Sequence, residues 1–221
     1  MVTLVSDTVT RNTVIFPVET GKGDFMHSFI DKLRGLKFRI TGSGEYDCAR
    51  VFAQAKAATE DTSPGNSGRK RVAIISPSGN VIVIPAPPAA VVSDAHIAQI
   101  SQIISPNPPR TVAAIADTRV SGSVPEISKT IPFAGILIGM AYIGHRVIVF
   151  DGQLSGIREG CRDSDVLIVD GAVLPHLHHD WYTTAKRVMR RPEIYMHDRN
   201  TFKLRPVLPK PAGGMSILSL R

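Results

Sequence analysis

The sequence has few cysteines and no segment typical of a secretory signal. Only Cys48 and Cys161 occur among its 221 residues. Two cysteines cannot make a disulfide framework, and these two are too far apart for a CxxC metal knuckle. The first twelve residues lack a basic start and an apolar run, so we expect no signal peptide. These absences predict reduced thiols and a cytoplasmic protein.

Positive charge is not concentrated in either part of the chain. The net charge is +7, but the excess of Lys and Arg over Asp and Glu is 4 in residues 1–150 and 3 in residues 151–221. Short basic runs, such as residues 69–71, are typical of solvated faces. Aromatic residues interleaved with basic ones, which would stack on bases, are absent. The sequence therefore argues against a nucleic-acid partner.

One hydrophobic run, Ile131 to Phe150, has about the twenty residues that a membrane-spanning helix needs. Gly144-His145-Arg146 interrupts it, and a histidine and an arginine are costly inside a lipid bilayer. We therefore predict no membrane span. We favour a hairpin of two buried strands, residues 133–142 and 145–150, over the alternative of one buried helix.

The other elements alternate between strands and helices. We expect strands at residues 71–76, 81–85, 111–116, 165–169 and 193–197, and helices at 94–105, around 157–161 and at about 180–190. The first two strands are joined by a tight turn at Pro77–Asn80. A polar loop follows the 111–116 strand, and Val124-Pro125-Glu126 is typical of a helix start. With 43% hydrophobic residues, the chain can bury one sizeable α/β core.

This order of elements, with Arg39 to Gly44 as a first-strand turn, resembles the metallo-β-lactamase superfamily. Its layout is most similar to the pyrroloquinoline quinone biosynthesis protein B branch. The resemblance implies a compact αββα sandwich with a shortened middle over residues 37–208. It also implies an N-terminal strand and helix appendage over residues 1–36 and a C-terminal tail over residues 209–221.

The metal-binding loop of that family is eroded in this chain. Its HxHxDH pattern falls on Asp117, Arg119, Ser121 and Gly122. Arginine stays cationic and glycine has no side chain, so neither can bind a metal. Residues 85–88, Pro-Ala-Pro-Pro, also replace the aspartate and glycine that support this loop in the family. We therefore expect no metal at this loop and no metal-dependent hydrolysis of the usual kind.

Three aspartates follow predicted strands and are the best candidates for a site. Asp117, Asp151 and Asp170 stand at strand ends, and carboxylates at the carboxyl edge of an α/β sheet tend to gather at its functional side. The resemblance places Asp151 near a bridging metal carboxylate and His197 at the last metal histidine. The alternative is that these aspartates cap the next helix or turn.

A second group of polar residues follows the strand that ends at Asp170. Three histidines and an aspartate, His176, His178, His179 and Asp180, occur within five residues. Imidazole and carboxylate ligands suit a single zinc, iron or manganese ion. A surface role is the alternative, with Asp180 as the N-terminal cap of the next helix.

Ser128-Lys129-Thr130, which precedes an apolar stretch and a strand ending at Asp151, resembles part of a phosphate-binding loop. Both glycines of GxxxxGK[ST] are serines here, Ser123 and Ser128. Glycine permits the backbone conformation that cradles phosphate. We therefore discount a nucleotide triphosphatase.

Two functions remain open on the sequence. The first is a binding, scaffold or assembly subunit that keeps the fold without the dinuclear hydrolase site. The second is an enzyme, of hydrolase or cofactor-biosynthesis type, with a rebuilt mononuclear or metal-free site. In either case Arg119 could supply the cation that crowded aspartates need, leaving a pocket suited to an anionic small molecule or to the carboxylate of a protein partner. The sequence decides neither the ligand nor whether the protein forms homo- or hetero-oligomers.

Overall fold

The computed structural model describes residues 13–15, 46–60, 70–84, 94–121, 124–201, 203–210 and 214–217. Two parts of the metallo-β-lactamase resemblance, residues 39–44 and 85–88, lie outside these ranges. Within the proposed N-terminal appendage, only residues 13–15 are described.

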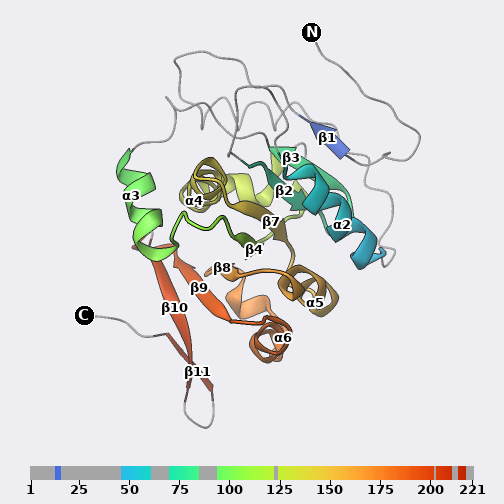
Figure 1. Ribbon diagram of the computed structural model, residues 1–221. Helices are drawn as coiled ribbons and strands as arrows, with labels where there is room; N and C mark the ends of the chain where they lie inside the picture. The colour runs from blue at the N-terminus through green and yellow to red at the C-terminus, as the bar shows by residue number, and fades with distance from the viewer. Residues whose placement is uncertain are drawn as a thin grey trace.

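One mixed sheet forms the middle of the molecule (Figure 1). Its strands are β1 (Thr13–Ile15), β2 (Val72–Ile75), β3 (Val81–Ile84), β4 (Thr111–Ile115), β7 (Arg146–Phe150), β8 (Val166–Asp170), β9 (Glu193–Asp198), β10 (Lys203–Lys210) and β11 (Gly214–Ile217). They are hydrogen-bonded in the order β1-β3-β2-β7-β4-β8-β9-β10-β11. The central strands β2, β7, β4, β8 and β9 are parallel. Nearly every residue of these strands up to β8 is buried, as expected where helices cover both faces of a parallel sheet.

Helices cover both faces of the sheet and enclose two apolar cores (Figure 1). The helices α3 (Asp94–Ile103) and α4 (Ile131–Tyr142) pack on one face. The helices α2 (Cys48–Ala58), α5 (Leu154–Arg162) and α6 (Trp181–Val188) pack on the other. The predicted α/β class is therefore confirmed. An αββα sandwich needs two sheets packed face to face, whereas the described strands, apart from the short pair β5 (Val120–Ser121) and β6 (Val124–Pro125), join one sheet.

The predicted β2–β3 hairpin is confirmed. Its strands are antiparallel, and Gly79 in the connecting turn has φ 78°, a conformation that favours glycine. The backbone N–H of Ser76 donates to Asn80 O at 2.9 Å, and that of Gly79 donates to Ser76 O at 2.9 Å. The predicted strands at 111–116, 165–169 and 193–197 correspond to β4, β8 and β9, and the three predicted helices correspond to α3, α5 and α6.

The hairpin predicted over residues 133–150 is wrong, because its first half is helix α4. Pro132 lies in the first turn of this helix, where a missing N–H costs nothing. Most of its side chains from Phe133 to Ala141 are buried between the sheet and α3. The predicted helix start at Val124 is also wrong, since residues 124–125 form β6 and the 3₁₀ turn η2 (Glu126–Lys129) follows. None of the helices in the described ranges combines the length and the hydrophobicity that crossing a lipid bilayer demands.

The chain leaves two adjacent parallel strands towards opposite faces of the sheet. After β4 it crosses to α4 on one face, and after β7 it continues into α5 on the other. The carboxyl ends of β4 and β7, which are direct neighbours, therefore border a topological switch point. In open α/β sheets, ligands bind in the crevice at this point.

Candidate functional site

A cavity of about 890 Å³ lies at this switch point. It is formed by residues that follow the strands β2, β7, β4 and β8 and by the start of α5. Its lining consists of Pro77, Ala116, Asp117, Arg119, Asp151, Gly152, Gln153, Leu154, Val173, His176, Leu177 and His178. We call this cavity the switch-point pocket. Among the residues predicted from the sequence, it collects two aspartates, the arginine and two histidines.

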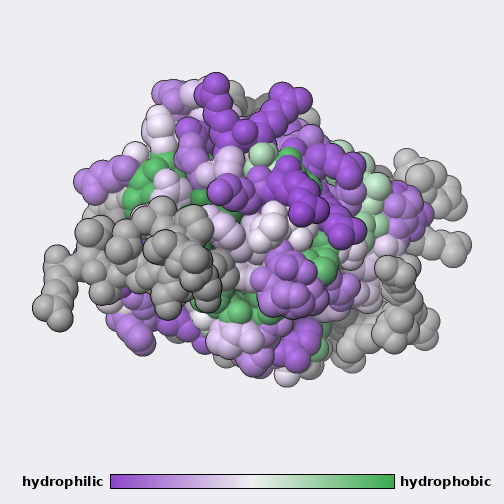
Figure 2. All heavy atoms as spheres, turned by 90° about the horizontal axis from the view of Figure 1, so that it is seen from below, coloured by the Kyte–Doolittle hydropathy of each residue, from purple (hydrophilic) through white to green (hydrophobic). Residues whose placement is uncertain are grey.

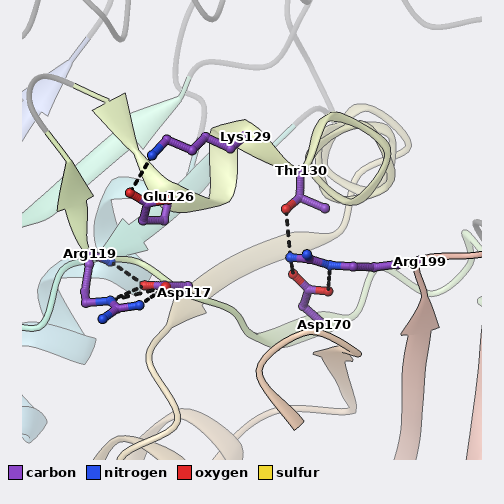
Figure 3. Close-up of polar contacts among 7 residues, drawn as sticks. All are labelled: Asp117, Arg119, Glu126, Lys129, Thr130, Asp170 and Arg199. Atoms are coloured by element: carbon purple, nitrogen blue, oxygen red, sulfur yellow. Dashed lines mark hydrogen bonds and ion pairs between the residues drawn. The ribbon is translucent and has the colours of Figure 1, made fainter. Parts of the chain in front are cut away.

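Asp117 and Arg119 form an ion pair on the loop after β4 (Figure 3). The Nε of Arg119 donates to Oδ1 of Asp117 at 2.9 Å and its Nη2 donates to Oδ2 at 2.5 Å. These hydrogen bonds lower the pKa of Asp117 and outweigh the opposing effect of its partial burial. The side chain of Arg119 is 76% exposed. Its outer edge is therefore open to a ligand as well as to solvent.

Asp151 follows β7 and is half-buried in the same pocket. Its carboxylate accepts hydrogen bonds from the backbone N–H of Gln153 at 3.3 Å and from the Gln153 side-chain amide at 2.9 Å. Burial, with a smaller contribution from the negative charge of Asp117, nevertheless raises the pKa of Asp151. Burial and the charge of Asp151 also raise the pKa of the neighbouring Tyr46. Asp151 is thus the pocket carboxyl that takes up a proton most readily.

Asp170 belongs to a second polar centre, beneath the start of α4 (Figure 3). Arg199 donates from Nε to Oδ1 of Asp170 at 3.2 Å and from Nη2 to Oδ2 at 3.1 Å, and the same Nη2 donates to Thr130 Oγ1 at 3.0 Å. Burial acts to raise the pKa of Asp170. The nearby His197 ring, the two N–H groups of Arg199 and the backbone N–H of Ala172 outweigh burial and hold this pKa below its usual value.

His197 is fully buried beside Asp170 and stacks on Phe133, with ring centroids 5.0 Å apart. Its Nδ1 lies 3.9 Å from Oδ1 of Asp170, which is too long for a hydrogen bond. Arg199, which donates two hydrogen bonds, therefore binds the Asp170 carboxylate more strongly than His197 does. Within the described residues, neither ring nitrogen of His197 has a hydrogen-bond partner.

The pleat of the strands separates Asp117 from Asp170. Asp151 lies just beyond the end of β7 and lines the switch-point pocket, although its register places it in the same row as Asp170. In the sheet register, Asp151, Ala116, Asp170 and His197 lie in one row across β7, β4, β8 and β9. Successive side chains on a strand point to opposite faces. Along β8, residues 166 and 168 face the α3–α4 core, and Asp170 follows them to the Thr130 side. Asp117 continues the series of Ala113 and Ile115, which face the α5–α6 side.

The histidine group lies on the loop between β8 and α6, which includes the turn η3 (Leu174–His176). His176 and His178 line the switch-point pocket. His178, His179 and Asp180 are exposed, and their ligand atoms lie within 4.8 Å of one another. Asp180 stands at the N-cap of α6 as predicted, but its side chain makes no capping hydrogen bond.

The phosphate-loop alternative agrees with the structure only in chain order. Helix α4 follows Thr130, and the next strand, β7, lies beside β4 and precedes Asp151. The loop itself contains the short β5–β6 pair and η2. The amine of Lys129 donates to Glu126 Oε1 at 2.7 Å (Figure 3). Ser128 Oγ donates to Pro125 O at 2.7 Å.

Sequence reasoning missed Arg199, Gln153 and Leu177. Arg199 follows β9 by one residue, at the same sheet edge as Asp170, so a basic residue at that strand end was a usable signal. Gln153 precedes the first residue of α5 and binds Asp151 through local hydrogen bonds. Leu177 lines the pocket and packs against Gly152, which follows β7. No local sequence pattern indicates such a contact between two distant loops.

Comparison with protein-family models gives no match, and neither curated proteins nor solved structures show a significant similarity to the chain.

Proposed function

We propose that this protein binds a small molecule carrying an acidic group in the switch-point pocket, without a dinuclear metal centre. The proposal keeps the non-hydrolytic binding function expected from the sequence. Descent from the metallo-β-lactamase superfamily remains a hypothesis. The order of the elements supports it, while the single main sheet and helix α4 count against the two-sheet form.

The observation that carries the proposal is a helix start beside a cation in one cavity. Gln153 and Leu154, at the N-terminus of α5, line the pocket together with Arg119. The N-cap residue Gln153 makes no side-chain capping bond to α5, and the first turn contains no acidic residue. The first N–H groups of a helix and its dipole favour an anion. A guanidinium adds charged donors for phosphate or carboxylate.

The two pocket carboxylates do not cancel this preference. Arg119 neutralises Asp117 through paired hydrogen bonds. Asp151 has a raised pKa, caused first by burial, so it gains a proton more readily than an ordinary aspartate. Protonated Asp151 could donate a hydrogen bond to an acidic group. His176 and His178 add imidazole groups to the lining of the pocket.

The test compares acidic ligands with neutral analogues of the same size. Thermal shift and calorimetry are run with ribose 5-phosphate against ribose, glycerol 3-phosphate against glycerol, and citrate. We expect binding by at least one acid and none by its neutral partner. Equal responses to both members of every pair, or none to any acid, would contradict the proposal.

Arg119→Ala tests the cation directly. It should weaken binding of the responsive acid by about tenfold, because charge-assisted hydrogen bonds are lost, and Arg119→Lys should restore part of it. Lys129→Ala is the matched control, since Lys129 is also exposed and paired with a carboxylate but does not line the pocket. Equal losses in the two alanine variants would show a general charge effect instead.

A catalytic role is the second candidate, and the raised pKa of half-buried Asp151 favours it. A carboxyl of this kind, in the same pocket as two histidines, could transfer a proton to a bound acid or its leaving group. Once a ligand is found, Asp151→Asn should abolish turnover while leaving ligand affinity within about threefold. If the protein binds the ligand but never converts it, the catalytic proposal fails and only the binding function is left.

A further inference from the structure

The loop between β8 and α6 brings two imidazoles and a carboxylate to one point. The Nε2 of His179 lies 3.3 Å from Oδ2 of Asp180, and the Nδ1 of His178 lies 3.8 Å from the same oxygen. The centroids of the two imidazole rings lie 4.1 Å apart. Zinc bonds of about 2.0–2.2 Å at tetrahedral angles place neighbouring ligand atoms about 3.3 Å apart. The Nδ1 of His178 accepts a hydrogen bond from the backbone N–H of Asp180 at 3.2 Å, so a metal would bind its Nε2 or displace that N–H. One ligand atom from each of the three residues lies within 4.8 Å of the others, and small side-chain rotations would bring these atoms to three corners of a zinc tetrahedron.

The orientation of Asp180 is the second observation. An aspartate at the N-cap normally accepts a hydrogen bond from the first turn of its helix, which stabilises the helix. Asp180 occupies the N-cap of α6 but makes no such bond. Its carboxylate lies instead beside the two histidines. A helix start that leaves this stabilisation unused is explained if the carboxylate has another partner.

Packing on both sides fixes the backbone of this loop. Leu177 packs against Gly152 so closely that a Cβ at Gly152 would overlap its side chain. On the other side, Trp181 is 2% exposed in the α5–α6 core. The backbone N–H of Trp181 also donates to His178 O at 2.9 Å. The three candidate ligands therefore project from a segment held at each end, which limits the entropy lost on metal binding.

We propose that His178, His179 and Asp180 form a binding site for a divalent transition metal, with zinc as the ion of choice. Two imidazoles and one carboxylate suit zinc and leave its fourth position open. His178 also lines the switch-point pocket, so the ion lies at the rim of that pocket. The site goes beyond the proposed ligand binding and does not depend on it, because its ligands are complete without Arg119 or α5.

Calorimetric titration of the tag-free, chelator-treated full chain with zinc chloride tests the site, with magnesium chloride as a comparison. We expect one zinc per chain and no magnesium heat, because magnesium prefers oxygen ligands. His178→Ala, His179→Ala and Asp180→Asn should each weaken zinc binding by at least about tenfold. All three residues are exposed, and unchanged melting temperatures of the metal-free variants would confirm that they fold.

His176→Ala is the matched control. His176 is an exposed imidazole of the same loop but lies outside the three-ligand cluster, so its loss should change the zinc affinity by less than about twofold. The proposal is overturned if the wild-type chain binds no zinc, if the three ligand variants keep its affinity, or if His176→Ala weakens binding as much as they do.

Discussion

Replacing Arg199 by alanine should lower the free energy of unfolding by about 2 kcal/mol at pH 7. The estimate lies between two limits. Exposed ion pairs contribute about 0–1 kcal/mol, whereas removing one partner of a fully buried pair costs about 3–5 kcal/mol. The Asp170 side chain is 3% exposed and that of Arg199 is 49% exposed. The variant leaves a buried carboxylate without its two charged donors, but water can reach the side that Arg199 vacates.

The loss should depend on pH in a defined direction. The folded-state pKa of Asp170 is lowered: burial opposes this shift, and the surrounding donors outweigh burial. The stabilisation is therefore complete above the unfolded-state pKa of about 4 and is lost as the pH falls through the lower folded-state value. The difference between wild type and Arg199→Ala should accordingly be largest near neutral pH and shrink below about pH 4.

Urea unfolding followed by the fluorescence of Trp181 measures this difference. Trp181 is the single tryptophan of the chain and is buried in the core on the opposite face from Thr130. Arg199→Lys should lie between wild type and alanine, because an ammonium group cannot span both oxygens of Asp170. A loss below about 0.5 kcal/mol at pH 7, or an equal loss at pH 7 and pH 3, would refute the assigned role of the pair.

Three further outcomes are expected. Gly160→Ala should destabilise the fold by about 1–2 kcal/mol, because overpacking exceeds the gain in helix propensity: the new Cβ would lie 2.5 Å from Cε1 of Phe150. Gly156→Ala in the same helix meets Phe150 at 3.4 Å and should keep the wild-type urea midpoint; similar midpoints for the two variants would contradict the packing. Ile148 is 2% exposed in the central strand β7, so Ile148→Lys should lower the free energy of unfolding by several kcal/mol and give little soluble protein. A well-folded variant would show that β7 is not a buried central strand. Arg119→Ala should leave the melting temperature of the ligand-free protein unchanged, since its ion pair is exposed; a marked drop would assign Arg119 a structural role.

Much of the fold could be predicted because the relevant signals are local. The turn at Gly79 and the apolar runs of β4 and β8 are visible in the sequence. Helix α4 was not predictable in the same way, because its buried surface surrounds most of the helix and leaves no polar face. Without a polar face the 3.6-residue period disappears, and a short apolar run rich in isoleucine looks like a strand.

The candidate site was predictable in position but not in grouping. Asp117, Asp151 and Asp170 stand at the ends of neighbouring strands as expected, because parallel strands end at one edge of the sheet. Which carboxylates share a pocket depends on the face that each side chain takes and on partners from distant segments. Arg199, which follows β9 and binds Asp170 at the end of β8, is such a partner.

One side of the molecule, seen from below in Figure 2, is mainly hydrophilic. Figure 2 shows one side of the molecule, on which hydrophilic residues predominate and hydrophobic ones occupy small separate areas among them. On the described part of that side, no broad apolar surface is visible.

Successive side chains at the ends of β4 and β8 point to opposite faces of the sheet. The sheet therefore separates the Asp117–Arg119 ion pair from the Asp170–Arg199 ion pair. Asp117 works with Arg119 on the α5 side, while Asp170 works with Arg199 and Thr130 under α4. A substitution on one side changes charge and hydration there without removing a direct partner from the other. Natural variation can thus change the proposed ligand binding in the switch-point pocket while the ion pair between Asp170 and Arg199 beneath α4 stays intact.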